Sequence, residues 1–166
     1  MEPKRAWWAR PRKLCVLERP GGGGRSHRPG RREGEITYLR ESGVWMVIST
    51  MTTRHNLADY EAAGLDWHHV PVTSTERGSA ALEELLPFLK RELERRGAIA
   101  VHGNRHTDFV AALGAAHLHH ARGIDPAEGL ARAAEAGLTV TPEACALLGI
   151  DIEAVQPPPN AIPARS

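Results

Sequence analysis

Cysteine, lysine and aromatic residues are scarce in this chain, and the shortage of cysteine excludes whole classes of protein. Two cysteines among 166 residues build neither a disulfide framework nor a cysteine-based zinc cluster. No apolar stretch approaches the roughly 20 residues that a membrane-spanning helix needs. The apolar run at residues 14–17 is also too short for a secretory signal. We therefore expect a cytoplasmic protein without a membrane partner.

The composition that remains is typical of one globular domain, but its charge is uneven. The chain is 42% hydrophobic and 25% charged, with a formal net charge of +1. Residues 1–34 hold ten basic and three acidic side chains, a net charge of +7, whereas the rest of the chain carries −6. The same segment contains four successive glycines at 21–24, which favour a loop, with at most a short strand at 13–18.

These shifts in composition divide the chain into three parts. We predict a basic Gly/Pro-rich leader at residues 1–34, a folded domain at residues 35–150, and a Pro-rich flexible tail at residues 151–166. The tail is assigned from three successive prolines at 157–159, which favour extended chain.

Strand and helix patterns alternate through the folded domain. Apolar runs at 44–51, 67–72 and 98–101 predict buried strands. Such an alternation indicates an α/β layer fold with a mostly parallel sheet. Helices are predicted at residues 36–43, 56–63, 80–96 (with a bend or break at Pro87), 108–121, and after the start signals Asp125-Pro126 and Thr141-Pro142.

Functional residues are expected where parallel strands end, because sites of such folds lie at the carboxyl ends of strands. Residues 50–56, 73–78 and 102–108 occupy these positions. The third segment runs from a buried strand through a short loop into a helix, and free amides at a helix start favour anions. We predict anion-binding residues Gly103, Asn104, Arg105, His106 and Thr107, and a crevice rim of Arg54, His55, Thr75 and Glu76.

The order of these pieces resembles that of small dual-specificity and tyrosine phosphatases of the cysteine-dependent superfamily. The resemblance spans residues 25–150 and implies a phosphatase-like three-layer fold, with a small, mostly parallel central sheet flanked by helices. Its matching pieces are Arg25-Ser26-His27-Arg28-Pro29, residues 36–48, 60–72 and 82–101, and Phe109-Val110-Ala111-Ala112.

Three departures from the family pattern argue against its chemistry. The signature of the family places a nucleophilic cysteine after the histidine that corresponds to His102, but this chain has Gly103 there. The loop from Gly103 to Thr107 is three residues shorter than the signature. The aspartate that serves the family as general acid is also missing, since Asp66 precedes its strand and Glu76 is out of register.

We therefore predict a pseudophosphatase-like protein, a phosphate-group-binding or regulatory module without cysteine-dependent phosphatase activity. Its partner would be a phosphorylated protein or a small phosphate ester. A phosphoesterase with altered chemistry stays open as an alternative, with His102 or His106 as base or nucleophile and Asp108 as the nearest acid.

Two further interpretations concern nucleic acid and metal. The basic leader, with Trp7 and Trp8 for stacking, is an alternative contact for nucleic acid. His106, His117 and His120 follow one helical stripe, but His106 is three turns from the others and no third ligand is evident. We predict neither a bound metal nor a cofactor.

Overall fold

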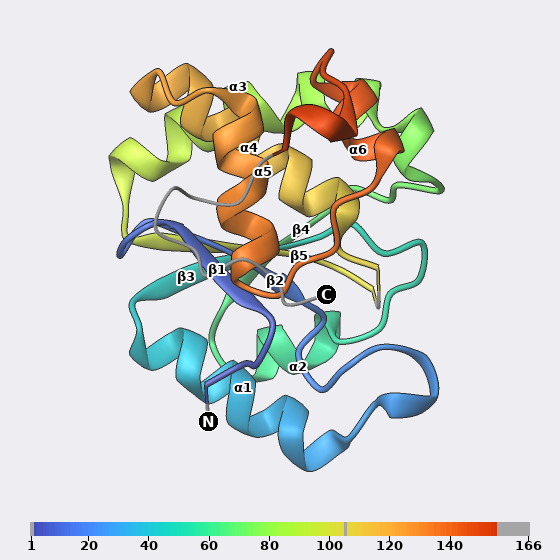
Figure 1. Ribbon diagram of the computed structural model, residues 1–166. Coiled ribbons are helices and arrows are strands. Elements are labelled where there is room, and N and C mark those ends of the chain that lie inside the picture. The colour runs from blue at the N-terminus through green and yellow to red at the C-terminus, as the bar shows by residue number, and fades with distance from the viewer. Residues whose placement is uncertain (1, 105, 156–166) are drawn as a thin grey trace.

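A sheet of five strands forms the centre of the protein in the computed structural model, which describes residues 2–104 and 106–155 (Figure 1). The strand order is β1-β2-β5-β3-β4. Only β1 runs antiparallel to its neighbour; the β2–β5, β5–β3 and β3–β4 pairs are parallel, which confirms the predicted sheet type. The strands are β1 (Ala6–Arg10), β2 (Leu14–Glu18), β3 (Val44–Ser49), β4 (Asp66–His69) and β5 (Ala98–Gly103).

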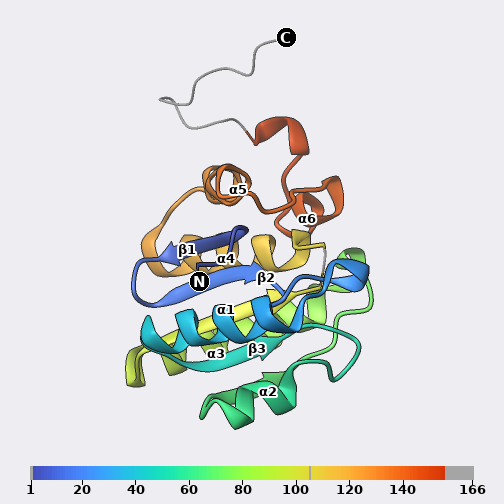
Figure 2. The ribbon, with the colours of Figure 1, turned by 90° about the horizontal axis from the view of Figure 1, so that it is seen from below.

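Helices cover both faces of this sheet and make three layers (Figures 1 and 2). On one face lie α1 (Pro29–Glu41) and α2 (Leu57–Ala62). The other face is covered by α3 (Ser79–Arg95), α4 (Asp108–Arg122), α5 (Pro126–Glu135) and α6 (Pro142–Leu147). Three 3-10 turns, Gly24–Ser26, Thr75–Arg77 and Ile152–Ala154, complete the described elements.

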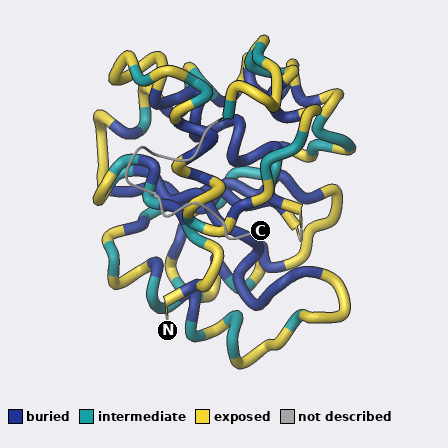
Figure 3. Tube along the Cα trace, in the orientation of Figure 1, coloured by how far each residue is buried: buried dark blue, intermediate teal, exposed yellow. Residues whose placement is uncertain are grey.

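The alternation of side chains along β5 explains why the sheet needs helices on both faces. Ala98 and Ala100 pack with α1 and α2, whereas Ile99 and Val101 pack with α3 and α4. All six β5 residues are buried, as expected of a central parallel strand. Figure 3 shows the buried sheet and the exposed outer turns of the helices.

The prediction that residues 1–34 are mainly loop is wrong, whereas the short strand offered at 13–18 is confirmed as β2. Residues 6–18 form the β1–β2 hairpin, and β2 lies between β1 and β5 with all five residues buried. The β2 run is short and apolar, so its pairing with β5 decides its conformation. Trp7 is 7% exposed and packs in the core, so it is not available for stacking on bases. The strands β1 and β2 of this segment therefore belong to the same sheet as β3, β4 and β5.

The other predicted elements are present with small shifts in their ends, except that α1 begins at Pro29 rather than near residue 36. The predicted break at Pro87 is wrong, since α3 continues through it. Asp125 and Thr141 cap α5 and α6 as predicted, each accepting a backbone hydrogen bond at 3.1 Å. The proline-rich part of the predicted tail, residues 156–166, lies outside the described residues.

Candidate functional site

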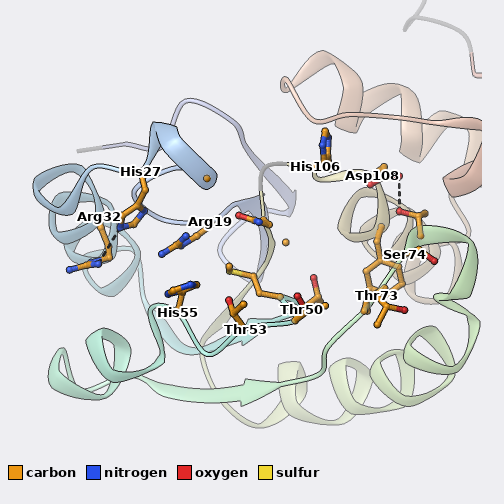
Figure 4. A pocket seen from close by; sticks show the side chains of 18 residues that line it. Arg19, His27, Arg32, Thr50, Thr53, His55, Thr73, Ser74, His106 and Asp108 are labelled. Carbon is orange, nitrogen blue, oxygen red and sulfur yellow. Dashed lines mark hydrogen bonds between the residues drawn. The ribbon is translucent and has the colours of Figure 1, made fainter.

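A crevice of about 810 Å³ opens where β3 and β5 end (Figure 4). The three segments predicted to meet at this edge of the sheet all contribute to its lining. The first 34 residues contribute as well, which sequence reasoning missed. We refer to residues 103–108 as the loop end, and to Arg19, His27, Arg32 and His55 as the basic end, which Figure 4 shows at opposite sides of the crevice.

The loop end folds back over Gly103. A Cβ atom on this buried glycine would lie 3.1 Å from the backbone oxygen of His106. A carbonyl oxygen therefore faces the position where the phosphatase family carries its nucleophile. A carbonyl oxygen repels an oxyanion, so the His106 carbonyl disfavours an anion beside Gly103.

Two residues at the start of α4 use their side chains for hydrogen bonds within the protein. Thr107 is 1% exposed, and its hydroxyl oxygen accepts a hydrogen bond from the Thr139 amide at 2.9 Å. Asp108 accepts hydroxyl hydrogen bonds from Thr75 at 2.6 Å and Thr141 at 2.9 Å. Its carboxylate complements the dipole of α4 and joins three segments. The prediction of Thr107 as an anion ligand is therefore corrected, and Asp108 has a structural role.

Of the five predicted anion ligands, two stay exposed on the crevice wall. Asn104 and His106 line the opening, whereas Gly103 and Thr107 are buried. Arg105 lies outside the described residues.

His102 is a buried structural residue, so its assignment as a candidate base or nucleophile is wrong. Its Nδ1 lies 2.9 Å from the Gly103 oxygen, which can only accept, so Nδ1 carries the hydrogen and Nε2 accepts from the Tyr60 hydroxyl at 2.7 Å. Burial lowers the pKa of His102 to about 4. Both ring nitrogens are engaged, and the side chain has no contact with solvent.

A chain of hydrogen bonds connects this histidine to the basic end. Asn56 donates to the Tyr60 hydroxyl at 3.3 Å and to the Pro20 oxygen at 2.9 Å, and its own oxygen accepts from Arg19 Nε at 3.1 Å. Asn56 stands at the start of α2, but its side chain makes no capping bond. Instead it fixes Arg19 in a buried position.

The basic end is built around Arg19, which is only 7% exposed. Beside it, Arg32 lies 3.4 Å from Asp59 and donates to His27 Nε2 at 3.1 Å. His27 Nδ1 in turn donates to the Gly22 oxygen at 2.8 Å. The signal in the sequence that could have indicated this basic end is the run of glycines at 21–24, which is flanked by basic residues. Because the segment was interpreted as a loop, these basic residues were given no role in the crevice.

Two of the four predicted rim residues line the crevice, and two lie elsewhere. His55 and Thr75 line the crevice. Arg54 lies instead over the Trp67 ring, with its guanidinium carbon 5.2 Å from the ring centroid. Glu76 lines a smaller cleft beside α6.

Neither cysteine replaces the missing nucleophile. Cys15 is buried in β2, and burial raises the pKa of its thiol to about 12. Cys145 is buried in α6, and burial also raises its pKa. Among the described residues, no three His, Cys, Asp or Glu side chains are grouped to hold a metal ion. His117 accepts from Arg10 at 3.3 Å, and burial lowers the pKa of this histidine to about 4.

The fold is similar to those of several solved phosphatase structures. TpbA from P. aeruginosa in complex with pTyr has a TM-score of 0.69 at 18% identity, covering 92% of this chain and 88% of that one. Human DUSP28 has a TM-score of 0.65 at 20% identity, covering 89% and 92%. Tk-PTP in the active form has a TM-score of 0.67 at 18% identity, covering 87% and 93%.

These likenesses establish a tyrosine and dual-specificity phosphatase-like fold, as the resemblance in the sequence predicted. No family model matches the sequence, and no curated protein matches it either. No helix in the described part of the chain is both long and apolar enough to span a membrane.

Proposed function

We propose that this phosphatase-fold protein binds a phosphate group in the crevice and does not hydrolyse it by cysteine chemistry. The observation that carries the proposal is the crevice itself. It opens at the carboxyl ends of β3 and β5, and it is lined by basic side chains and by exposed polar residues of the loop end. As expected from the sequence, the ligand that carries this phosphate group is either a phosphorylated protein or a small phosphate ester.

The absence of a nucleophile supports a binding or regulatory role. Gly103 has no side chain, and both cysteines are buried in elements away from the crevice lining. The alternative of histidine-based hydrolysis now rests on His106 alone, because His102 is buried and fully bonded. Asp108, the acid nearest to His106 in the sequence, holds Thr75 and Thr141 instead.

A calorimetric titration and a hydrolysis assay test this function together. We expect the protein to bind phosphotyrosine or inorganic phosphate more tightly than it binds tyrosine. We expect p-nitrophenyl phosphate to stay intact. Hydrolysis that disappears in His106→Ala would establish the histidine-based alternative. A protein that binds no phosphate compound would contradict the proposal.

Nucleic-acid contact through residues 1–34 stays a prediction, and no described contact favours it. Several basic side chains of this segment are engaged within the fold. Lys13 donates to two backbone oxygens of the α3 region, and Arg31 pairs with Glu18 and Glu35. The cytoplasmic location is likewise part of the proposal, and the two free, buried cysteines support it.

A further inference from the structure

Arg19 is a largely buried cation that forms no ion pair among the described residues, although Asp59 lies close enough to favour its charged form. Its Nε is bonded to Asn56, and no hydrogen bond or ion pair within the described part of the chain engages its two terminal nitrogens. Burial lowers the pKa of this guanidinium, which stays charged near neutral pH. A desolvated charge of this kind is costly unless a counter-charge completes it. The crevice is where that counter-charge can enter, because Arg19 lines it.

The glycine run 21–24 builds the rest of this site rather than acting as a flexible linker. Gly21 and Gly22 have φ of +93° and +85°, conformations that side-chain-bearing residues rarely adopt. A Cβ on Gly21 would lie 2.5 Å from the His27 ring and 2.7 Å from Arg32 Cβ. The glycine backbone therefore packs directly against the two residues that stand beside Arg19 in Figure 4.

The acids near this cluster leave it with excess positive charge. Glu18 and Glu35 pair with Arg31, which does not line the crevice. Asp59 pairs with Arg32 at 3.4 Å, and its side chain is 39% exposed, so this bond is a weak competitor. Two guanidinium groups with one partly exposed carboxylate leave a net positive charge, which attracts a phosphate group, and guanidinium forks bind phosphate well.

Hydroxyl groups line the crevice between the two ends. Thr52, Thr53 and Thr73 are exposed there, and the buried Ser74 hydroxyl has no partner among the described residues. Such groups suit a ligand that itself carries hydroxyls, because each can donate and accept. A crevice of about 810 Å³ also has the size of a small-molecule site.

The surface offers little for a protein partner. Ile152 is the only large apolar side chain exposed among the described residues, whereas protein interfaces rely on buried apolar and aromatic anchors. We infer that the crevice binds a small polyhydroxylated phosphate ester, such as a sugar or polyol phosphate, with its phosphate on Arg19 and Arg32 and its hydroxyls along the threonines. This inference rests on the proposed function and names its ligand class.

Calorimetry on the full chain tests the inference with inorganic phosphate, glycerol 3-phosphate, glucose 6-phosphate, inositol 1-phosphate and a phosphotyrosine peptide. At least one of the three polyol phosphates should bind tenfold tighter than inorganic phosphate. If none does, or if the phosphopeptide binds tightest, the ligand class is overturned. If no compound binds, the proposed function fails as well.

Variants of the basic end test where the phosphate lies. Arg19→Met should weaken phosphate affinity by about tenfold to a hundredfold, the usual effect of losing hydrogen bonds to a charged group. Arg95→Met is the matched control, because that side chain is 69% exposed on α3, and it should leave affinity unchanged. Equal affinity in the wild type and in Arg19→Met would overturn the site while the proposed function stood.

Two substitutions at half-buried positions keep the test decisive if Arg19→Met does not fold. Arg32→Gln should weaken phosphate binding by about tenfold. Asp59→Asn should tighten it by about threefold, because it removes the carboxylate that competes for Arg32. If the Asp59–Arg32 pair had only a structural role, Asp59→Asn would not increase the phosphate affinity. Unchanged or weaker phosphate binding in Asp59→Asn would therefore contradict the inference.

Discussion

The two ends of the crevice use polar side chains for opposite purposes. At the loop end and in His102, the residue directly before it, the polar side chains of Thr107, Asp108 and His102 all have hydrogen-bond partners within the protein. At the basic end, Arg19 keeps its terminal nitrogens free of described partners although it is buried. Satisfied buried groups stabilise a fold, whereas an uncompensated one marks a place for a ligand. Substitutions at the loop end should therefore change stability, and those at the basic end should change binding.

The largest effect on stability should come from acid at the loop end. The pKa of His102 is about 4 in the folded protein and about 6.5 in an unfolded chain, so the unfolded state binds the proton more readily. The stability that depends on the neutral form is complete above pH 6.5 and is lost as the pH falls from 6.5 to 4, by roughly 3 kcal/mol. Urea unfolding at pH 7, 6, 5 and 4 measures this loss.

His102→Asn is the control for that measurement, because it removes the titrating group and keeps His117, whose pKa is also lowered to about 4. The difference in slope between the wild type and the variant isolates His102. Equal slopes would show that this buried histidine does not couple folding to pH.

Asp108→Ala should separate stability from binding. The Thr75 and Thr141 hydroxyls would lose their acceptor, which should lower the free energy of unfolding by about 1–3 kcal/mol. Phosphate affinity should hold or improve, because a negative charge leaves the crevice lining. Chemical unfolding measures the stability and calorimetry measures the phosphate affinity of the same sample. Glu83→Ala, at an exposed position of α3, is the control. A collapse of phosphate affinity would place the anion at the loop end.

A pair of glycine substitutions tests how the basic end is built. Gly21→Ala combines φ of +93° with a Cβ 2.5 Å from the His27 ring, so it should displace His27 and Arg32. We expect a loss of about 1–2 kcal/mol in stability and weaker phosphate binding. Gly24 also has a positive φ of +56°, but a Cβ there would have no atom within 4 Å. Gly24→Ala should therefore cost stability through backbone strain alone, without displacing a residue of the basic end. Identical phosphate affinity in the two variants would contradict the packing role of Gly21.

The smallest effect is expected where the phosphatase family has its nucleophile. Gly103→Cys restores a thiol at the end of β5, and its Cβ needs a shift of the His106 carbonyl, now 3.1 Å away. We expect no hydrolysis of p-nitrophenyl phosphate above background, because an inward carbonyl and a missing acid leave the thiol without support. Turnover that iodoacetate abolishes would show a working cradle.

The sequence predicted the layers of this fold well, but it did not predict the residues of the basic end of the crevice. The leucine spacing of α3 and the apolar runs of β3 and β5 predict elements by local pattern alone, and the structure confirms them. The short strand offered at residues 13–18 corresponds to β2, but β1 and the pairing of β2 with β5, far along the chain, were missed. The same error hid Arg19, His27 and Arg32, since a loop leader gives no reason to place them beside residues 50–55.

Histidine and asparagine roles were the hardest to predict from spacing. His102 and Asn56 look like site residues because each adjoins a strand end or a helix start. His102 is bonded to Tyr60, and Asn56 is bonded to Arg19, and these partners come from other parts of the chain. Only the folded structure shows that both side chains are fully engaged in buried hydrogen bonds. A sequence position at the correct edge of a sheet therefore predicts proximity to a site, not membership in it.

Arginine side-chain NMR during a titration with inorganic phosphate tests the central claim most directly. The account predicts that the Nε–Hε signals of Arg19 and Arg32 shift and saturate together, while the backbone amide of Thr107 stays in place. Saturating shifts at the amides of residues 103–107, with the two arginine signals unchanged, would contradict it.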